Sequence, residues 1–149
     1  MKKLLLSAGM AAGLMVALPQ AGQAQSEWPL KSAEYVDVAG IEIDDGHMLD
    51  YANFLTSTWR KSQDFALKQG WITGYEILLN NNPRDGEPDI YLLTRFMSFP
   101  DSDEEDKRDA AYQKHMAKTI GQMEEESGGR AEYRHVTESM LLRRLVWRK

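Results

Sequence analysis

The sequence predicts an α+β fold with four strands and two helices, in the order strand, helix, strand, strand, helix, strand. Two long segments repeat apolar residues at steps of three, four or seven, which is the spacing of an amphipathic helix. Four other segments are rich in valine, isoleucine, leucine and tyrosine and are bounded by turn-forming residues, as strands are. In this order the strands form an antiparallel sheet with both helices on one face.

The first strand and the first helix follow each other directly. Residues 34–43 (EYVDVAGIEI) alternate in part between apolar and polar side chains, which predicts a strand that ends at the turn sequence DDG. Residues 48–69 predict a helix, with Gly70 as a left-handed terminator. Its apolar face carries Met48, Tyr51, Leu55, Trp59 and Ala66. Its solvent side carries Arg60, Lys61, Asp64 and Lys68.

The middle of the chain predicts an antiparallel hairpin. Residues 72–79 (ITGYEILL) and 89–99 (DIYLLTRFMSF) have the composition of strands. Residues 80–88 between them are dense in asparagine, proline, aspartate and glycine, which form turns. The two strands should therefore pair with each other across this loop.

A second helix and a last strand complete the order. Ser102 with Glu105 fits a capping box, and the acids at 103–106 suit the positive end of a helix dipole. The two glycines at 128–129 are expected to end this helix. Residues 137–147 (TESMLLRRLVW) predict the last strand.

This element order is the split βαβ, or ferredoxin-like βαββαβ, arrangement. One face of the four-stranded sheet is covered by the two helices, while the other face still carries apolar side chains. A monomer rarely exposes an apolar patch larger than a few hundred Å². Two such sheets facing each other would bury both patches, so the sequence predicts a homodimer.

Residues 1–24 are predicted to be a secretory signal peptide. The chain opens with MKK, the stretch from Leu4 to Leu18 has no charge, and GQA places small residues at the cleavage positions. The alternative, a membrane anchor, needs about 20 apolar residues, whereas Leu4 to Leu18 has fifteen. Residues 25–33 would form a flexible lead-in and residues 34–149 the domain. We expect a periplasmic or secreted protein of a Gram-negative bacterium.

Composition excludes several classes of function. The chain has no cysteine, so it has no disulfide, no cysteine nucleophile and no lipid-anchor cysteine. Its net charge is −5, and removal of the two lysines in residues 1–24 takes it to −7. This acidity argues against a general nucleic-acid binder. The histidines His47, His115 and His135 share no metal-binding spacing, and no GxSxG, phosphate-cradling or dinucleotide motif is present.

The chain resembles the dimeric α/β-barrel superfamily over about residues 34–148. The resemblance rests on the element order and on the local sequences KQGW, GYEILL, PDIYLLTRF and ESMLLRRLVW, the last of which resembles the final strand of many small secreted proteins of this type. The superfamily includes antibiotic-biosynthesis-type monooxygenases, muconolactone-isomerase-like enzymes, haem-degrading and haem-binding proteins, and stress-response proteins without a clear activity. The resemblance implies a ferredoxin-like homodimer and leaves the activity open, because none of these sequences is a catalytic motif.

Four residues are candidates for a ligand site: Trp59, Tyr75, Arg95 and His115. The aromatic residues either fill the core or line a small apolar pocket between helices and sheet. Arg95 interrupts an apolar strand, where a charge needs a partner, so it either pairs with Glu76 or holds an anionic ligand. His115 is either a solvated residue at the edge of the core or, as the superfamily suggests, a haem ligand.

Three functional hypotheses follow. The first is an exported homodimer that binds a small apolar or aromatic molecule, or acts by association alone, without catalysis or cofactor. The second is a cofactor-free monooxygenase of the antibiotic-biosynthesis type, in which Trp59, Tyr75 and Arg95 line a pocket and activate a phenolic substrate. The third is a haem-binding module that uses His115.

Overall fold

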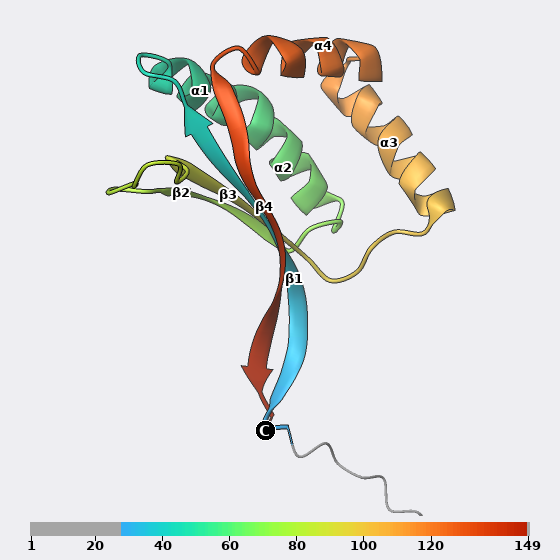
Figure 1. Cartoon of the computed structure of the whole chain (residues 1–149). Coiled ribbons are helices and arrows are strands. Elements are labelled where there is room, and N and C mark those ends of the chain that lie inside the picture. Colours follow the sequence, from blue (N-terminus) through green and yellow to red (C-terminus); the bar gives the residue numbers. More distant parts are fainter. Residues whose placement is uncertain (1–27, 149) are drawn as a thin grey trace, which may run out of the picture.

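The computed structural model describes residues 28–148 of the chain (Figure 1). The predicted signal peptide, residues 1–24, lies outside the described residues. Within them, the sheet and helices are β1 (Leu30–Ile43), α1 (Met48–Phe54), the π-helical turn η1 (Leu55–Trp59), α2 (Arg60–Lys68), β2 (Gly74–Leu79), β3 (Ile90–Phe96), α3 (Ser102–Met116), α4 (Ile120–Arg130) and β4 (Arg134–Trp147).

The four strands form one antiparallel sheet in the order β2-β3-β1-β4. The predicted α+β class and the hairpin between β2 and β3 are therefore confirmed, with Gly74 opposite Arg95 and Leu79 opposite Ile90. Because β1 and β2 are both antiparallel to β3, they run parallel to each other with β3 between them. The helix that joins β1 to β2 crosses over this intervening strand.

The first predicted helix is confirmed, and it contains a turn of a different kind. The segments α1, η1 and α2 follow one another without a break from Met48 to Lys68, and Gly70 with φ 73° ends them as predicted. The π-helical turn η1 was not predicted. Its wider hydrogen-bonding pattern changes the helix register by one residue, a local change that composition does not signal.

The prediction of one continuous second helix ended by glycines 128–129 is wrong. Ala117 has a left-handed φ of 55° and ends α3. Thr119 then begins α4 with a capping box, in which its side chain and that of Gln122 satisfy each other's backbone N–H groups. Both glycines lie inside α4. The cap of α3 is also displaced by one residue, because the Asp101 carboxylate accepts from the backbone N–H of Glu104.

The first and last strands of the chain are longer than predicted. β1 begins at Leu30, inside the segment expected to be a flexible lead-in, and β4 begins at Arg134. Their pairing extends to Leu30 opposite Trp147, whereas pairing of β1 with β3 stops at Tyr35. Beyond that point β1 and β4 continue as a two-stranded ribbon, which projects below the rest of the molecule in Figure 1.

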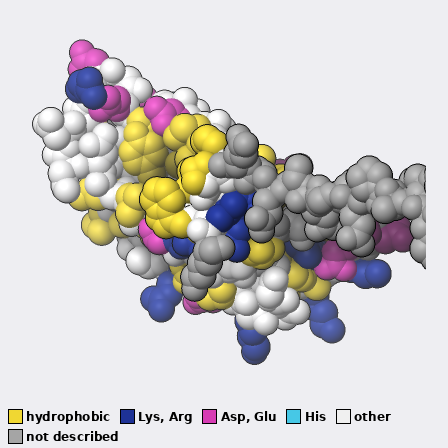
Figure 2. All heavy atoms as spheres, turned by 90° about the horizontal axis from the view of Figure 1, so that it is seen from below, with side chains coloured by type: hydrophobic (Ala, Val, Ile, Leu, Met, Phe, Trp, Pro, Cys, Tyr) yellow, Lys and Arg dark blue, Asp and Glu magenta, His cyan; other side chains and the backbone are white. Residues whose placement is uncertain are grey.

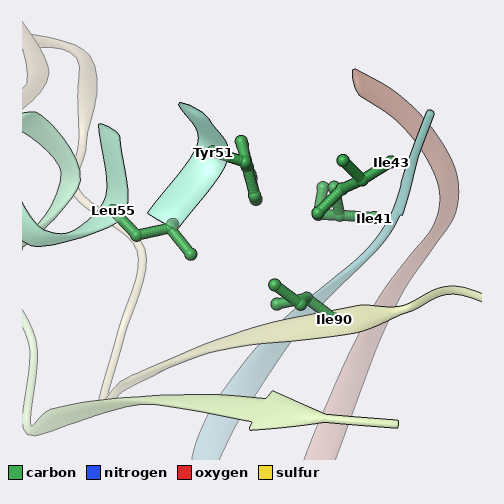
Figure 3. Close-up of a cluster of buried hydrophobic side chains, with 5 residues drawn as sticks. All are labelled: Ile41, Ile43, Tyr51, Leu55 and Ile90. Carbon is green, nitrogen blue, oxygen red and sulfur yellow. The ribbon is translucent and has the colours of Figure 1, made fainter. Parts of the chain in front are cut away.

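The core is small and lies between the first helix and the middle of the sheet. It consists of Ile41, Ile43, Tyr51, Leu55 and Ile90. Figure 3 shows Tyr51 and Leu55 on the helix and the three isoleucines on β1 and β3. Burial raises the pKa of the Tyr51 phenol above its usual value of 10.

α3 is attached through α2. The Tyr112 hydroxyl bonds to Ser62 at 3.0 Å, and His115 stacks on Phe65 with ring centroids 4.1 Å apart. These two contacts join α3 to the outward side of the first helix. The residues that make them also line the hollows described below.

Gly40 is required by a close approach between β1 and its neighbours. A Cβ atom at this position would lie 2.5 Å from Pro88 Cγ and 2.8 Å from Glu138 Cβ. We expect Gly40→Ala to destabilise the protein by about 1–3 kcal/mol, as overpacking does, and to lower the midpoint of urea unfolding. Gly121→Ala is the matched control, because no atom lies within 4 Å of its Cβ position in α4. Alanine there should stabilise the helix, and a loss of stability as large as that of Gly40→Ala would contradict this account.

Candidate functional site

The sheet register separates the four candidate residues. Tyr75 lies opposite Thr94, and Arg95 is the next residue along β3. Adjacent residues of a strand point to opposite faces, so Tyr75 faces the helices and Arg95 faces away from them. Trp59 packs edge-on against Tyr75, with ring centroids 5.3 Å apart and an interplanar angle of 86°. His115 lies on α3, so the structure brings together only Trp59 and Tyr75 of the four.

Tyr75 is held as a hydrogen-bond donor. Its hydroxyl donates to the carboxylate of Asp64 on α2. That bond, followed by desolvation and by the charge of Asp64, raises the pKa of the Tyr75 phenol above 10. The hydrogen bond to Asp64 thus favours the protonated phenol.

Arg95 is paired within its own sheet. Its guanidinium forms an ion pair with Glu76 across the β2–β3 hairpin, which confirms the structural alternative that the sequence offered. The Arg95 side chain is 24% exposed and that of Glu76 47%. The cation that the monooxygenase hypothesis assigns to a substrate is thus engaged by a carboxylate, and it lies on the opposite face from Trp59 and Tyr75.

The sheet face that carries Arg95 and Glu76 is largely apolar, although Glu138 also lies on it, opposite Gly40. We call it the open face. Cross-strand pairs place its side chains in one band, because directly opposite residues share a face. Its apolar residues, of which Val38 at 5% exposure is buried, are Val36, Val38, Leu78, Tyr91, Leu93, Met140 and Leu142. Leu78, Met140 and Leu142 are 46%, 38% and 48% exposed. Figure 2 shows hydrophobic side chains open to solvent on the surface seen from below.

A groove of about 520 Å³ lies against the outward side of the first helix where α3 approaches it. Its lining residues are Thr56, Ser57, Arg60, Lys61, Asp64, Phe65, Lys68, Gln69 and His115. A second hollow of about 470 Å³ shares Phe65, Gln69 and His115 with it and adds Ala111 and Lys114. Trp59 lines a separate cavity of about 110 Å³ between the helices, with Tyr112, Met116 and Met123 among its walls.

His115 is the candidate residue that lies in the groove. Its ring is nearly parallel to that of Phe65, at an interplanar angle of 9°. Its Nε2 atom is buried and has no hydrogen-bond partner among the described residues. Because this atom is buried, neither haem iron nor a ligand oxygen in the groove could reach it unless the imidazole ring moved.

From the sequence, the basic residues of the groove are expected on the solvent side of the first helix, with no role in a site. Arg60, Lys61 and Lys68 recur there at helical spacing, and that recurrence is a signal for a cationic surface. The groove itself could not be found in this way, because its other wall comes from α3. The π-helical turn at one end of the groove had no sequence signal.

The remaining questions about a site concern metal-binding groups, the other two histidines and membrane-spanning helices. In the part of the chain that it describes, no three histidine, cysteine or acidic side chains are grouped to hold a metal ion. His47 and His135 lie on the surface, beside Asp50 and Asp44 respectively. None of the described helices has the length and apolar character needed to cross a membrane.

Comparison with protein-family models, with curated proteins and with solved structures gave no match.

Proposed function

We propose that this chain is an exported, non-catalytic binding domain that works as a homodimer and carries a small aromatic molecule. The observation that carries the proposal is the open face, an apolar band that crosses all four strands and includes half-exposed Leu78 and Leu142. Apolar bands of this kind mark association surfaces. A second copy offers a self-complementary one, since the same patch meets itself across a two-fold axis.

The finer fold assignment belongs to the same proposal. The strand order β2-β3-β1-β4 with the first helix crossing over β3 is that of a ferredoxin-like sheet. In the dimeric α/β-barrel arrangement that the sequence resembles, two such sheets face each other. The open face is the surface that this arrangement would bury.

The β1–β4 ribbon gives independent support for a partner. Leu145 and Trp147 near its end are 47% and 76% exposed. A two-stranded ribbon is marginally stable alone in water, so a stretch that extends past β3 gains stability when another surface covers it. Leu145 and Trp147 share the face of β4 that carries Leu141, which is opposite to that of Leu142, so the ribbon would meet a partner through a surface distinct from the open face.

The positions of the three residues that the monooxygenase hypothesis invokes favour binding over catalysis. Trp59 and Tyr75 lie on one side of the sheet and Arg95 on the other, so they do not converge on one substrate. Arg95 is paired with Glu76, and the Tyr75 hydroxyl donates to Asp64. A pocket that holds a ligand needs only shape and a few polar groups, which the hollows between α2 and α3 offer.

Native mass spectrometry of protein purified from its own compartment tests this proposal. We expect the dominant ion series to have twice the mass of the mature chain, and the chain to begin near residue 25. A bound small molecule would appear as an additional constant mass. A single-chain species at micromolar concentration would overturn the homodimer, and an N-terminus that retains residues 1–24 would overturn export with cleavage.

A further inference from the structure

The groove between α2 and α3 has a charge opposite to that of the whole chain. The chain carries a net charge of −5. The walls of the groove and of the adjoining hollow carry four basic residues and one acid, namely Arg60, Lys61, Lys68, Lys114 and Asp64. Asp64 lies 3.6 Å from Arg60. Lys61 and Lys68 have no ion-pair partner among the described residues, so this surface attracts an anion.

The floor of the groove is aromatic. Phe65 of α2 and His115 of α3 are stacked and line both hollows. A planar aromatic ligand can pack against such a wall in an offset or edge-on geometry. The buried Nε2 atom of His115 lacks a partner among the described residues, and it can donate to or accept from an oxygen of that ligand once the imidazole ring turns toward the groove.

The size and backbone of the groove fit a binding site. A volume of about 520 Å³ falls in the range of about 300–1,000 Å³ that small-molecule pockets occupy. Thr56 and Ser57 on its rim belong to the π-helical turn η1, and their hydroxyls donate to backbone carbonyls one turn earlier. Single π-helical turns occur frequently at functional sites.

From these observations we infer that the groove binds a small aromatic carboxylate, with the ring against Phe65 and His115 and the carboxylate held by Lys61 and Lys68. The inference rests on the proposed binding role and names its ligand class. It does not rest on the homodimer, because the groove lies on the helices and the open face lies on the other side of the sheet.

Titration with 2-naphthoate and its neutral analogue 2-naphthamide tests the inference in the full mature protein. We expect 2-naphthoate to bind at least tenfold more tightly than the amide and to weaken as salt rises, because the two probes differ in charge at nearly constant shape. Binding should also shift the His115 imidazole resonances in an NMR spectrum, which places the probe in the groove.

The double variant Lys61→Gln/Lys68→Gln should weaken the binding of 2-naphthoate about tenfold or more and leave the affinity for 2-naphthamide unchanged. Lys31→Gln/Lys107→Gln removes the same charge from exposed positions outside the groove, and it should bind as the unaltered protein does. Circular dichroism would show that both variants fold.

Equal affinity for the two probes, or equal loss in both double variants, would overturn the inference. Such a result leaves the proposed function intact, since the protein would still bind an aromatic molecule. Failure of both probes to bind at millimolar concentration overturns the inference as well, and native mass spectrometry then decides separately whether the protein is a dimer or carries a different molecule.

Discussion

Leu142→Glu is expected to convert the protein from a homodimer to a monomer. Leu142 is 48% exposed in the single chain and lies on the open face opposite Val36. In a two-fold dimer each substitution places two glutamates at the interface. A buried, unpaired carboxylate costs several kcal/mol, and about 4 kcal/mol weakens association roughly 1,000-fold. Sedimentation velocity at micromolar protein would report the change as a shift from twice the chain mass to one.

Leu141→Glu is the matched control for this substitution. Leu141 is the neighbouring residue of β4, is 55% exposed, and points to the opposite face of the sheet. The same change of side chain there should leave the dimer intact. Circular dichroism separates dissociation from unfolding in both variants. A dimer that survives Leu142→Glu, or one that both substitutions disrupt equally, would show that the open face is not the interface.

Ile41→Ala is expected to produce the largest loss of folding stability. Ile41 is 2% exposed and packs in the core with Tyr51, Leu55 and Ile90. Truncation of a buried isoleucine to alanine costs about 2–5 kcal/mol, through lost transfer energy and the cavity that remains. Because the buried cluster is small, few neighbours can close that cavity. With an m value of about 2 kcal/mol/M, in the middle of the usual range, the urea midpoint should fall by roughly 1–2.5 M.

Ile77→Ala tests whether burial is the reason for the large stability loss expected from Ile41→Ala. Ile77 lies on the same face of the sheet, in β2, but it is 44% exposed. Substitutions at exposed positions away from special features change stability by about 0.5 kcal/mol, so a loss of at most about 1 kcal/mol is expected there. Comparable losses from the two substitutions would contradict the placement of the core at Ile41.

The first helix and the hairpin were predictable because their signals are local. The apolar residues between Met48 and Ala66 recur at helical spacing, and Gly70 supplies the left-handed residue that ends the segment. The second helix was predicted too long, although its break had a usable signal. Thr119 and Gln122 have the spacing of a capping box. The prediction instead took the two glycines at 128–129 as the end of one continuous helix.

The candidate site was predictable only in part. The pairing of Arg95 with Glu76 followed from the cost of an unpaired charge on an apolar strand, and the structure confirms it. The stack of Phe65 on His115 could not be predicted, because those residues are fifty positions apart and meet only when α3 packs on α2. The groove and its cationic walls depend on that contact.

The sequence by itself determined the α+β class, the β2–β3 hairpin and the exclusion of cysteine chemistry, because each depends on composition or on residues close together in the chain. Only the tertiary structure decided that Tyr75 and Arg95 face opposite sides of the sheet and that His115 faces a groove. The physical reason is that a shift of one residue in strand register exchanges the two faces. That register, like the meeting of two helices, is set by long-range packing.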